Sequence, residues 1–293
     1  MDNFDDQLEV FFGEATTTQA RVYAQLPRGH WPAEAKLIGT LVGPTCLYAE
    51  TLPTHYRFRD RHHRSSDSSP DLLLTEAVIP DPCFWTPQLP YLYELKLELR
   101  RGDEVLARTS RPFGVRPFGV RGSSFLYASK RWVLRGRRTP IDAVDLRQCH
   151  QAEIAIATSS FDATQAAEAS RIGVLMAVEI GTKSSTARQA SCQAAIGMLI
   201  FDPSNAADAL PKTTNCILVQ NMLSDAHADL HERTQAVLVE ASHVREFADR
   251  HGAKIPIVAY RYSQSLELAE TRSQCDQLQA DLAGVGDFAG YLV

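Results

Sequence analysis

Three carboxylates, Glu179, Asp202 and Glu240, stand at or directly after short apolar runs, where buried strands would deliver them to a common edge. Two carboxyl groups that face one pocket can divide the acid, base and nucleophile roles of a hydrolysis between them. Carboxylates at strand ends also cap helices or pair with arginines, and Arg135 and Arg261 are at hand for such pairs. We favour the structural role for Asp202, and Asp202 with Glu240 is the candidate catalytic pair.

The elements that must position these side chains follow a regular pattern after Lys130. Short apolar strands alternate with Ala-rich helical stretches, for example at 162–171, 242–251 and 266–282. The eight predicted strands are residues 132–134, 153–158, 174–178, 196–201, 216–220, 236–239, 256–260 and 288–293. Apolar strands separated by helices indicate a parallel sheet buried on both faces, and eight of them predict a closed (β/α)8 barrel. It is shorter than the roughly 250 residues of a typical barrel, so we expect short loops and a shallow mouth.

Active sites in this fold lie at the carboxyl-terminal ends of the strands. The residues at these ends could also contact a ligand without catalysing a reaction. The candidate ligand-binding residues are Arg135, Ser160, Glu179, Asn221, Arg261 and Tyr262.

Residues 1–117 contain alternating apolar and polar runs between Pro, Gly and Asp turns, which predict an immunoglobulin-like β-sandwich. Residues 118–293 then form the barrel. The charged, serine-rich segment 57–70 is expected to be an exposed mobile loop. Its His62 and His63 are not expected to bind a metal, because neighbouring loop residues rarely converge on an ion without further ligands.

Composition narrows the function classes. The chain has 293 residues and a net charge of −5, so it offers no basic surface for nucleic acid. No apolar run approaches the roughly 20 residues that span a bilayer, and the acidic N-terminus is unlike a signal peptide, so a cytoplasmic location is expected. The six cysteines form no C-x-x-C pair, and no glycine-rich phosphate loop follows a strand, so neither a metal nor a cofactor is predicted. His227 and His231 have i, i+4 spacing but are interpreted as a solvated helix face.

The segment 84–136, which joins the two parts, carries recognisable motifs. Its matching residues, with those of the strands that follow, are Trp85, Pro87, Pro90, Leu92, Tyr93, Phe113, Gly114, Arg116, Leu134, Arg135, Gly136, Thr158, Ser159, Phe161, Gly173 and Glu179. Over about residues 35–180 the sequence resembles the family 2 glycoside hydrolases, the β-galactosidase and β-glucuronidase group. This resemblance implies a sandwich followed by a (β/α)8 barrel, with Glu179 at the rim of a sugar site.

The residues that would carry the family's chemistry do not match. Ala157 and Ser160 stand where the resemblance implies Arg and His, and Ala128 and Ser129 replace Asn-Gly. The acid/base glutamate expected after the fourth strand and the nucleophilic glutamate expected after the seventh are both absent, as is a counterpart of the family's preceding jelly-roll domain. Two carboxyl groups about 5 to 5.5 Å apart are needed for retaining hydrolysis.

The expected function is therefore that of a catalytically inactive relative that binds a carbohydrate or a protein partner. One alternative is an active or altered O-glycosyl hydrolase that uses Asp202 with Glu240 or Glu179. A second alternative is a scaffold protein whose barrel mouth is closed by its own side chains. The oligomeric state does not follow from the sequence.

Overall fold

The computed structural model describes residues 4–29, 31–60, 72–204, 207–252, 254–263 and 267–293, and His62 and His63 lie outside them. The chain divides into two compact units. The first unit comprises Met1–Arg116 together with Cys192–Ala194 and Lys212–Asn215, and the second comprises the remaining residues. The predicted fold class, a β-sandwich followed by a compact (β/α)8 barrel, is confirmed.

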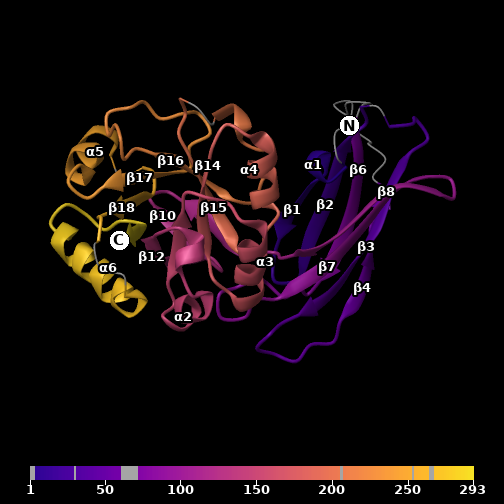
Figure 1. Ribbon diagram of the computed structural model, residues 1–293, viewed down its shortest axis with the longest axis horizontal. Helices are drawn as coiled ribbons and strands as arrows, with labels where there is room; N and C mark the ends of the chain where they lie inside the picture. Colours follow the sequence, from indigo (N-terminus) through magenta and orange to yellow (C-terminus); the bar gives the residue numbers. More distant parts are fainter. Residues whose placement is uncertain (1–3, 30, 61–71, 205–206, 253, 264–266) are drawn as a thin grey trace. The chain divides into compact units, whose positions relative to one another are not determined.

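The first unit contains two antiparallel four-stranded sheets (Figure 1). One has the order β1 (Glu9–Ala15), β2 (Gln19–Pro27), β6 (Leu72–Pro80), β5 (Arg59–Asp60); the other has the order β4 (Thr54–Arg57), β3 (Lys36–Thr45), β7 (Leu92–Arg101), β8 (Glu104–Phe113). A short helix, α1 (Phe4–Gln7), precedes them. In β2 and β7 every second side chain is buried, as expected for strands with one face on a core. The alternation that predicts the sandwich is thus the pattern that builds its core.

The second unit is a closed ring of eight parallel strands. In ring order they are β12 (Leu134–Arg138), β13 (Ala155–Thr158), β14 (Met176–Ile180), β15 (Ile196–Phe201), β16 (Ile217–Asn221), β17 (Ala236–Glu240), β18 (Ile257–Tyr260) and β19 (Gly290–Leu292). Every residue of β13 and β15 is buried, since side chains on one face fill the ring and those on the other meet the surrounding layer.

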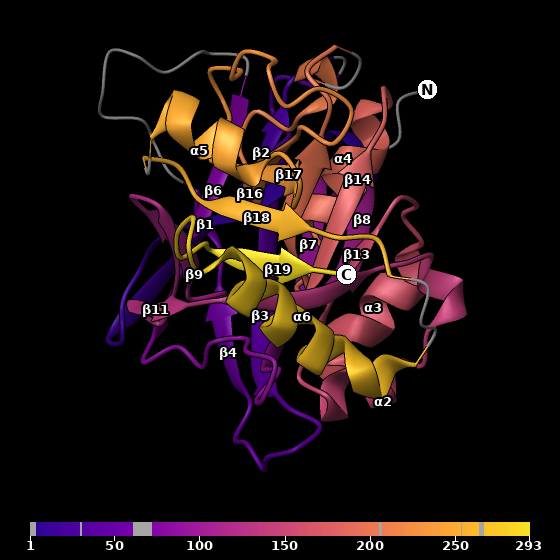
Figure 2. The same cartoon turned by 90° about the vertical axis from the view of Figure 1, so that its left-hand side faces the viewer.

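Few helices surround the ring. They are α2 (Leu146–Gln151), α3 (Ala163–Ile172), α4 (Ser184–Ser191), α5 (Val244–His251) and α6 (Leu268–Leu282), with 3-10 turns at Ile141–Ala143 and Ala207–Ala209. Helix α3 begins where the Asp162 carboxylate accepts the Gln165 N–H at 2.7 Å, and it ends at Gly173, whose φ of 91° is left-handed. Helix α6 packs along β12 and β19, and Figure 2 shows it beside β19.

The connection between β16 and β17 corrects a sequence interpretation. His227 and His231 belong to a loop there and not to a helix. The loop is tied to the buried side chain of Gln220, whose Oε1 accepts the His231 N–H at 2.9 Å and the Thr234 hydroxyl at 2.7 Å. These anchors replace the backbone hydrogen bonds that a helix would have supplied.

The first barrel strand is shifted relative to its prediction at 132–134. Trp132 ends β11 (Lys130–Trp132), which pairs with β10 (Ser124–Tyr127) in a three-stranded sheet completed by β9 (Phe118–Arg121). Its ring packs edge-on against Phe118, with the ring centroids 5.3 Å apart. The apolar run Trp132-Val133-Leu134 is therefore shared between two elements, and β12 continues to Arg138. This shift decides which arginine reaches the mouth of the barrel.

Among the residues that the structure describes, no helix is both long and apolar enough to cross a membrane.

Candidate functional site at the mouth of the barrel

A pocket of about 270 Å³ opens at the carboxyl-terminal ends of four neighbouring strands, β13 to β16. It is lined by Ser159, Glu179, Ile180, Gly181, Ile200, Phe201, Asp202 and Asn221. Each of these strands is apolar along its buried length and becomes polar where it ends, so hydroxyl, carboxylate and amide groups gather beside apolar side chains. Such a lining can form hydrogen bonds with a small polar molecule and contact its apolar face.

The pocket brings together three of the predicted residues, Glu179, Asp202 and Asn221. They lie at the ends of adjacent strands β14, β15 and β16, and parallel strands deliver such residues to one edge. Ser160 does not line the pocket, whereas its neighbour Ser159 does. The Ser160 backbone is instead bonded to the Thr158 hydroxyl, at 3.4 Å through its N–H and 3.3 Å through its carbonyl.

Glu179 is engaged by Arg138, a residue that sequence reasoning missed. The Arg138 Nε lies 2.8 Å from Glu179 Oε1, and Nη2 lies 2.7 Å from the same oxygen. The Arg138 Cζ also stands 5.5 Å from the centroid of the Tyr260 ring, a cation–π contact. Arg138 ends β12, Glu179 lies near the end of β14, and Tyr260 ends β18, so the three side chains form a bridge across the mouth. We call Arg138, Glu179 and Tyr260 the mouth bridge.

The charge of Arg138 is stabilised in this position. Partial burial disfavours the charged guanidinium, but the hydrogen bond and charge of Glu179, together with Tyr260, outweigh burial and raise the pKa of Arg138 above its ordinary value. Arg138 therefore remains a cation within the mouth.

Asp202 lines the pocket and also shapes its wall. Its Oδ1 accepts the Ser204 N–H at 2.9 Å and the Ser204 hydroxyl at 2.7 Å, which closes a tight turn after β15. Asn221 makes a similar turn, because its Oδ1 accepts the Leu223 N–H at 3.0 Å. These local bonds fix both side chains at the rim.

Glu240 lies apart from the other carboxylates. It ends β17, its side chain is exposed, and it does not line the pocket. Asp202 and Glu240 are thus not brought to one pocket, whereas Glu179 and Asp202 are.

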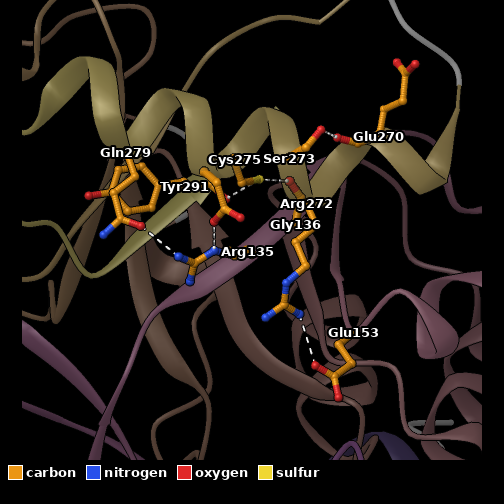
Figure 3. Close-up of polar contacts among 10 residues, drawn as sticks. Arg135, Gly136, Glu153, Glu270, Arg272, Ser273, Cys275, Gln279 and Tyr291 are labelled. Atoms are coloured by element: carbon orange, nitrogen blue, oxygen red, sulfur yellow. Dashed lines mark hydrogen bonds and ion pairs between the residues drawn. The ribbon is translucent and has the colours of Figure 1, made fainter.

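Two predicted ligand-binding arginines point to helix α6 instead. Arg135 is the second residue of β12, where its Nε lies 2.5 Å from Asp276 Oδ1 and its Nη2 lies 2.7 Å from Gln279 Oε1 (Figure 3). Its placement at a strand end is therefore wrong, since the strand runs on to Arg138. Arg261 Nη1 lies 2.6 Å from Asp281 Oδ2. Tyr262 is 74% exposed.

No cluster of three or more His, Cys, Asp or Glu side chains able to hold a metal occurs among the described residues. The His227 Nε2 lies 3.4 Å from Glu246 Oε1, and His231 packs its ring against Phe201 with centroids 5.8 Å apart. Neither histidine belongs to a cluster of potential metal ligands within the described part of the chain.

Comparisons with known proteins agree on the fold. Residues 48–116 match the family model "Glycosyl hydrolases family 2". A β-glucuronidase from Bacteroides uniformis is similar over 98% of this chain and 45% of its own, with 13% identity and a TM-score of 0.65. A family 2 glycosyl hydrolase from Bacteroides cellulosilyticus has 14% identity and a TM-score of 0.67 over 98% of this chain and 45% of its own. A putative β-galactosidase from Bacteroides fragilis has 12% identity and a TM-score of 0.59 over 98% and 54%.

The chain thus resembles the family 2 glycosyl hydrolases in its sequence over residues 48–116 and in its fold over nearly its whole length. It spans about half the length of these solved structures. No match was found among curated protein sequences.

Proposed function

We propose that the barrel mouth binds a small carbohydrate without hydrolysing it. The observation that carries this proposal is the state of the two carboxylates that share the pocket: Glu179 is bonded to Arg138, and Asp202 is bonded to Ser204. One oxygen of each carboxylate, Glu179 Oε1 and Asp202 Oδ1, is thus held by contacts that build the mouth. The remaining candidate, Glu240, lies outside the pocket.

Glycoside hydrolysis explains why this arrangement is unfavourable for catalysis. One carboxyl group must donate a proton to the leaving oxygen while the other attacks the sugar or activates water. If Glu179 attacked through its other oxygen, the ester formed would carry no charge, and the Arg138 guanidinium would lose its anionic partner. An Asp202 that donated a proton would have to carry it on Oδ2, and protonation would weaken the two hydrogen bonds that Oδ1 accepts from Ser204.

The pocket itself supports a sugar as the ligand. Its volume of about 270 Å³ is close to the lower end of the roughly 300–1,000 Å³ of ligand pockets, which suits a single ring better than a chain. Ser159, Glu179, Asp202 and Asn221 supply hydrogen-bonding groups for hydroxyls, and Ile200 and Phe201 supply apolar contact. The similar solved proteins are named as sugar-cleaving enzymes, which adds support for this ligand class. A hollow of this size favours a small molecule over a protein partner.

The experiment measures binding and turnover on the same protein. Ligand-observed NMR with a panel of methyl glycosides is expected to give millimolar binding by at least one sugar, lost in Asn221→Ala. Arg261→Ala is the matched control, because this rim arginine is turned to Asp281, and it should bind as the unmodified protein does. If no glycoside binds, the proposal is wrong.

One observation favours a second candidate, an altered O-glycosyl hydrolase, because Glu179 and Asp202 line one pocket on neighbouring strands. The same protein is therefore assayed with nitrophenyl glycosides. We expect no turnover above background. Turnover that vanished in both Glu179→Gln and Asp202→Asn would replace the non-hydrolysing function with this one.

A further inference from the structure

The mouth bridge places a positive charge over the axis of the barrel. In a closed ring of eight strands, two strands that are four steps apart face each other across the axis, and β14 and β18 are four steps apart. The Arg138 guanidinium touches Glu179 on β14 and stands 5.5 Å from the Tyr260 ring on β18. Because one group meets both opposite strands, it lies near the centre of the mouth and not against one wall.

This position divides the mouth into two parts. The pocket occupies the side formed by β13 to β16, and each of its lining residues comes from those strands or directly follows them. The side chains of Arg138 and Glu179 are only 31% and 20% exposed, so the bridge is a packed feature and not a loose surface pair. A ligand that extended from the pocket toward β18 would have to displace the guanidinium.

We infer that Arg138 is a specificity-determining residue that restricts the pocket to a ligand of one ring. This inference rests on the proposed carbohydrate-binding function. A longer ligand that displaced the guanidinium would remove it from a carboxylate and from an aromatic face at once, and both contacts are strongest where water is excluded. Arg138 thus occupies the space in which the second ring of a disaccharide would lie.

Removal of the Arg138 side chain should leave a space that preferentially binds a cation. It would be bounded by the Glu179 carboxylate and the Tyr260 ring, which together recognise a planar or ammonium cation. A small guanidinium ion should therefore bind to the variant and restore the bridge. This consequence can be tested without any sugar.

The experiment compares Arg138→Ala with Arg135→Ala in the full chain. Both remove an arginine from β12, but Arg135 faces helix α6 and not the mouth. Ethylguanidinium binding by ligand-observed NMR is expected to be about tenfold tighter for Arg138→Ala than for Arg135→Ala or the unmodified protein. A methyl disaccharide is expected to bind Arg138→Ala but not Arg135→Ala. If circular dichroism shows that Arg138→Ala fails to fold, Arg138→Gln, which keeps a polar side chain, takes its place.

The outcomes separate the two proposals. Equal ethylguanidinium binding by both folded variants would overturn the axial position of Arg138 and with it the inference. Rescue by ethylguanidinium without monosaccharide binding to any protein would overturn the proposed function, and with it the one-ring limit, while supporting the axial placement of the guanidinium. Rescue and monosaccharide binding, with the disaccharide still excluded, would overturn the assignment of the size limit to Arg138.

Discussion

The two faces of strand β12 each carry an arginine, and the two arginines have different partners. On the outer face, Arg135 bonds to Asp276 and Gln279 of helix α6, where Asp276 is 54% exposed. On the inner face, Arg138 bonds to Glu179, which is 20% exposed, and stands against the ring of Tyr260. Arg135 pairs with a helix outside the ring, whereas Arg138 lies at the mouth of the barrel. Three positions along one strand thus separate an arginine that faces helix α6 from one that faces the mouth.

The largest expected effect is on stability. Arg138→Ala should lower the free energy of unfolding by about 2 kcal/mol, because it leaves the half-buried Glu179 carboxylate without its partner. Arg135→Ala removes a more exposed pair and should cost no more than about 1 kcal/mol. Urea unfolding followed by circular dichroism measures both values. Equal losses in the two variants would mean that the inner and outer faces are energetically alike.

The charge of the pocket should determine whether a cationic or an anionic glycoside binds more tightly. Two carboxylates line the pocket, and none of its lining residues is basic. A methyl glycoside that carries an amino group should therefore bind about tenfold more tightly than the corresponding uronate. This difference in affinity corresponds to about 1.4 kcal/mol of binding free energy. Titration by NMR at two salt concentrations tests this, with the neutral glycoside as the control. Tighter binding of the uronate would show that Arg138 serves the ligand and not Glu179.

The buried Cys275 thiol of helix α6, which packs on β12, should make the free energy of unfolding depend on pH. Burial, partly offset by a hydrogen bond to Gly136, raises the pKa of Cys275 to about 11. The folded chain keeps this proton after the unfolded chain has released it near pH 9, so the stabilisation is complete well below pH 9 and is lost as pH rises through 11. Relative to Cys275→Ala, about 1 kcal/mol should be lost between pH 8 and pH 10. Ser273→Ala, also on α6, should follow the unmodified protein; if Cys275→Ala did too, another group would be responsible.

The smallest expected effect is on the pKa of Asp281, a residue of helix α6 that forms an exposed ion pair with Arg261. The hydrogen bond from Arg261, followed by one from Gln277, lowers the pKa of Asp281 below its ordinary value. The associated stabilisation is present above the unfolded pKa of about 3.9 and disappears as pH falls below it. In Arg261→Ala the carboxyl pKa, followed by carbon NMR, should move back toward the ordinary value. An unchanged pKa would show that Arg261 does not act on Asp281.

Much of the fold could be predicted because the strands are strongly apolar. Strand β15 occurs at the predicted residues 196–201, all six of which are buried. Helix α4 was not among the helical stretches named from the sequence, since its sequence SSTARQAS is polar apart from its alanines and only Ala187 and Ala190 are buried. A helix held to the ring by two alanines leaves a weak signal in hydropathy.

The site was predictable only where it depends on strand ends. Asp202 follows the apolar run of β15 and Asn221 ends β16, so their positions at the mouth follow from the topology. Arg138 was missed because β12 reads LRGRR, in which three arginines among five residues hide a largely buried strand. Arg135 and Arg138 are accommodated by partners on α6 and β14, which only the folded chain brings near. Polar groups paired over long sequence distances are not visible to local pattern analysis.

Ring closure has a consequence for folding. The ring is joined by the pairing of β12 with β19, and at that seam a Cβ on Gly290 would come within 2.7 Å of the Leu134 Cβ, so the two strands meet at close quarters. These strands are the first and the last of the barrel in the chain. Until β19 is in place, both β12 and β18 present unpaired strand edges, which are templates for aggregation. The three residues of β19 therefore complete the pairing that removes both edges, and closing so long a loop costs conformational entropy.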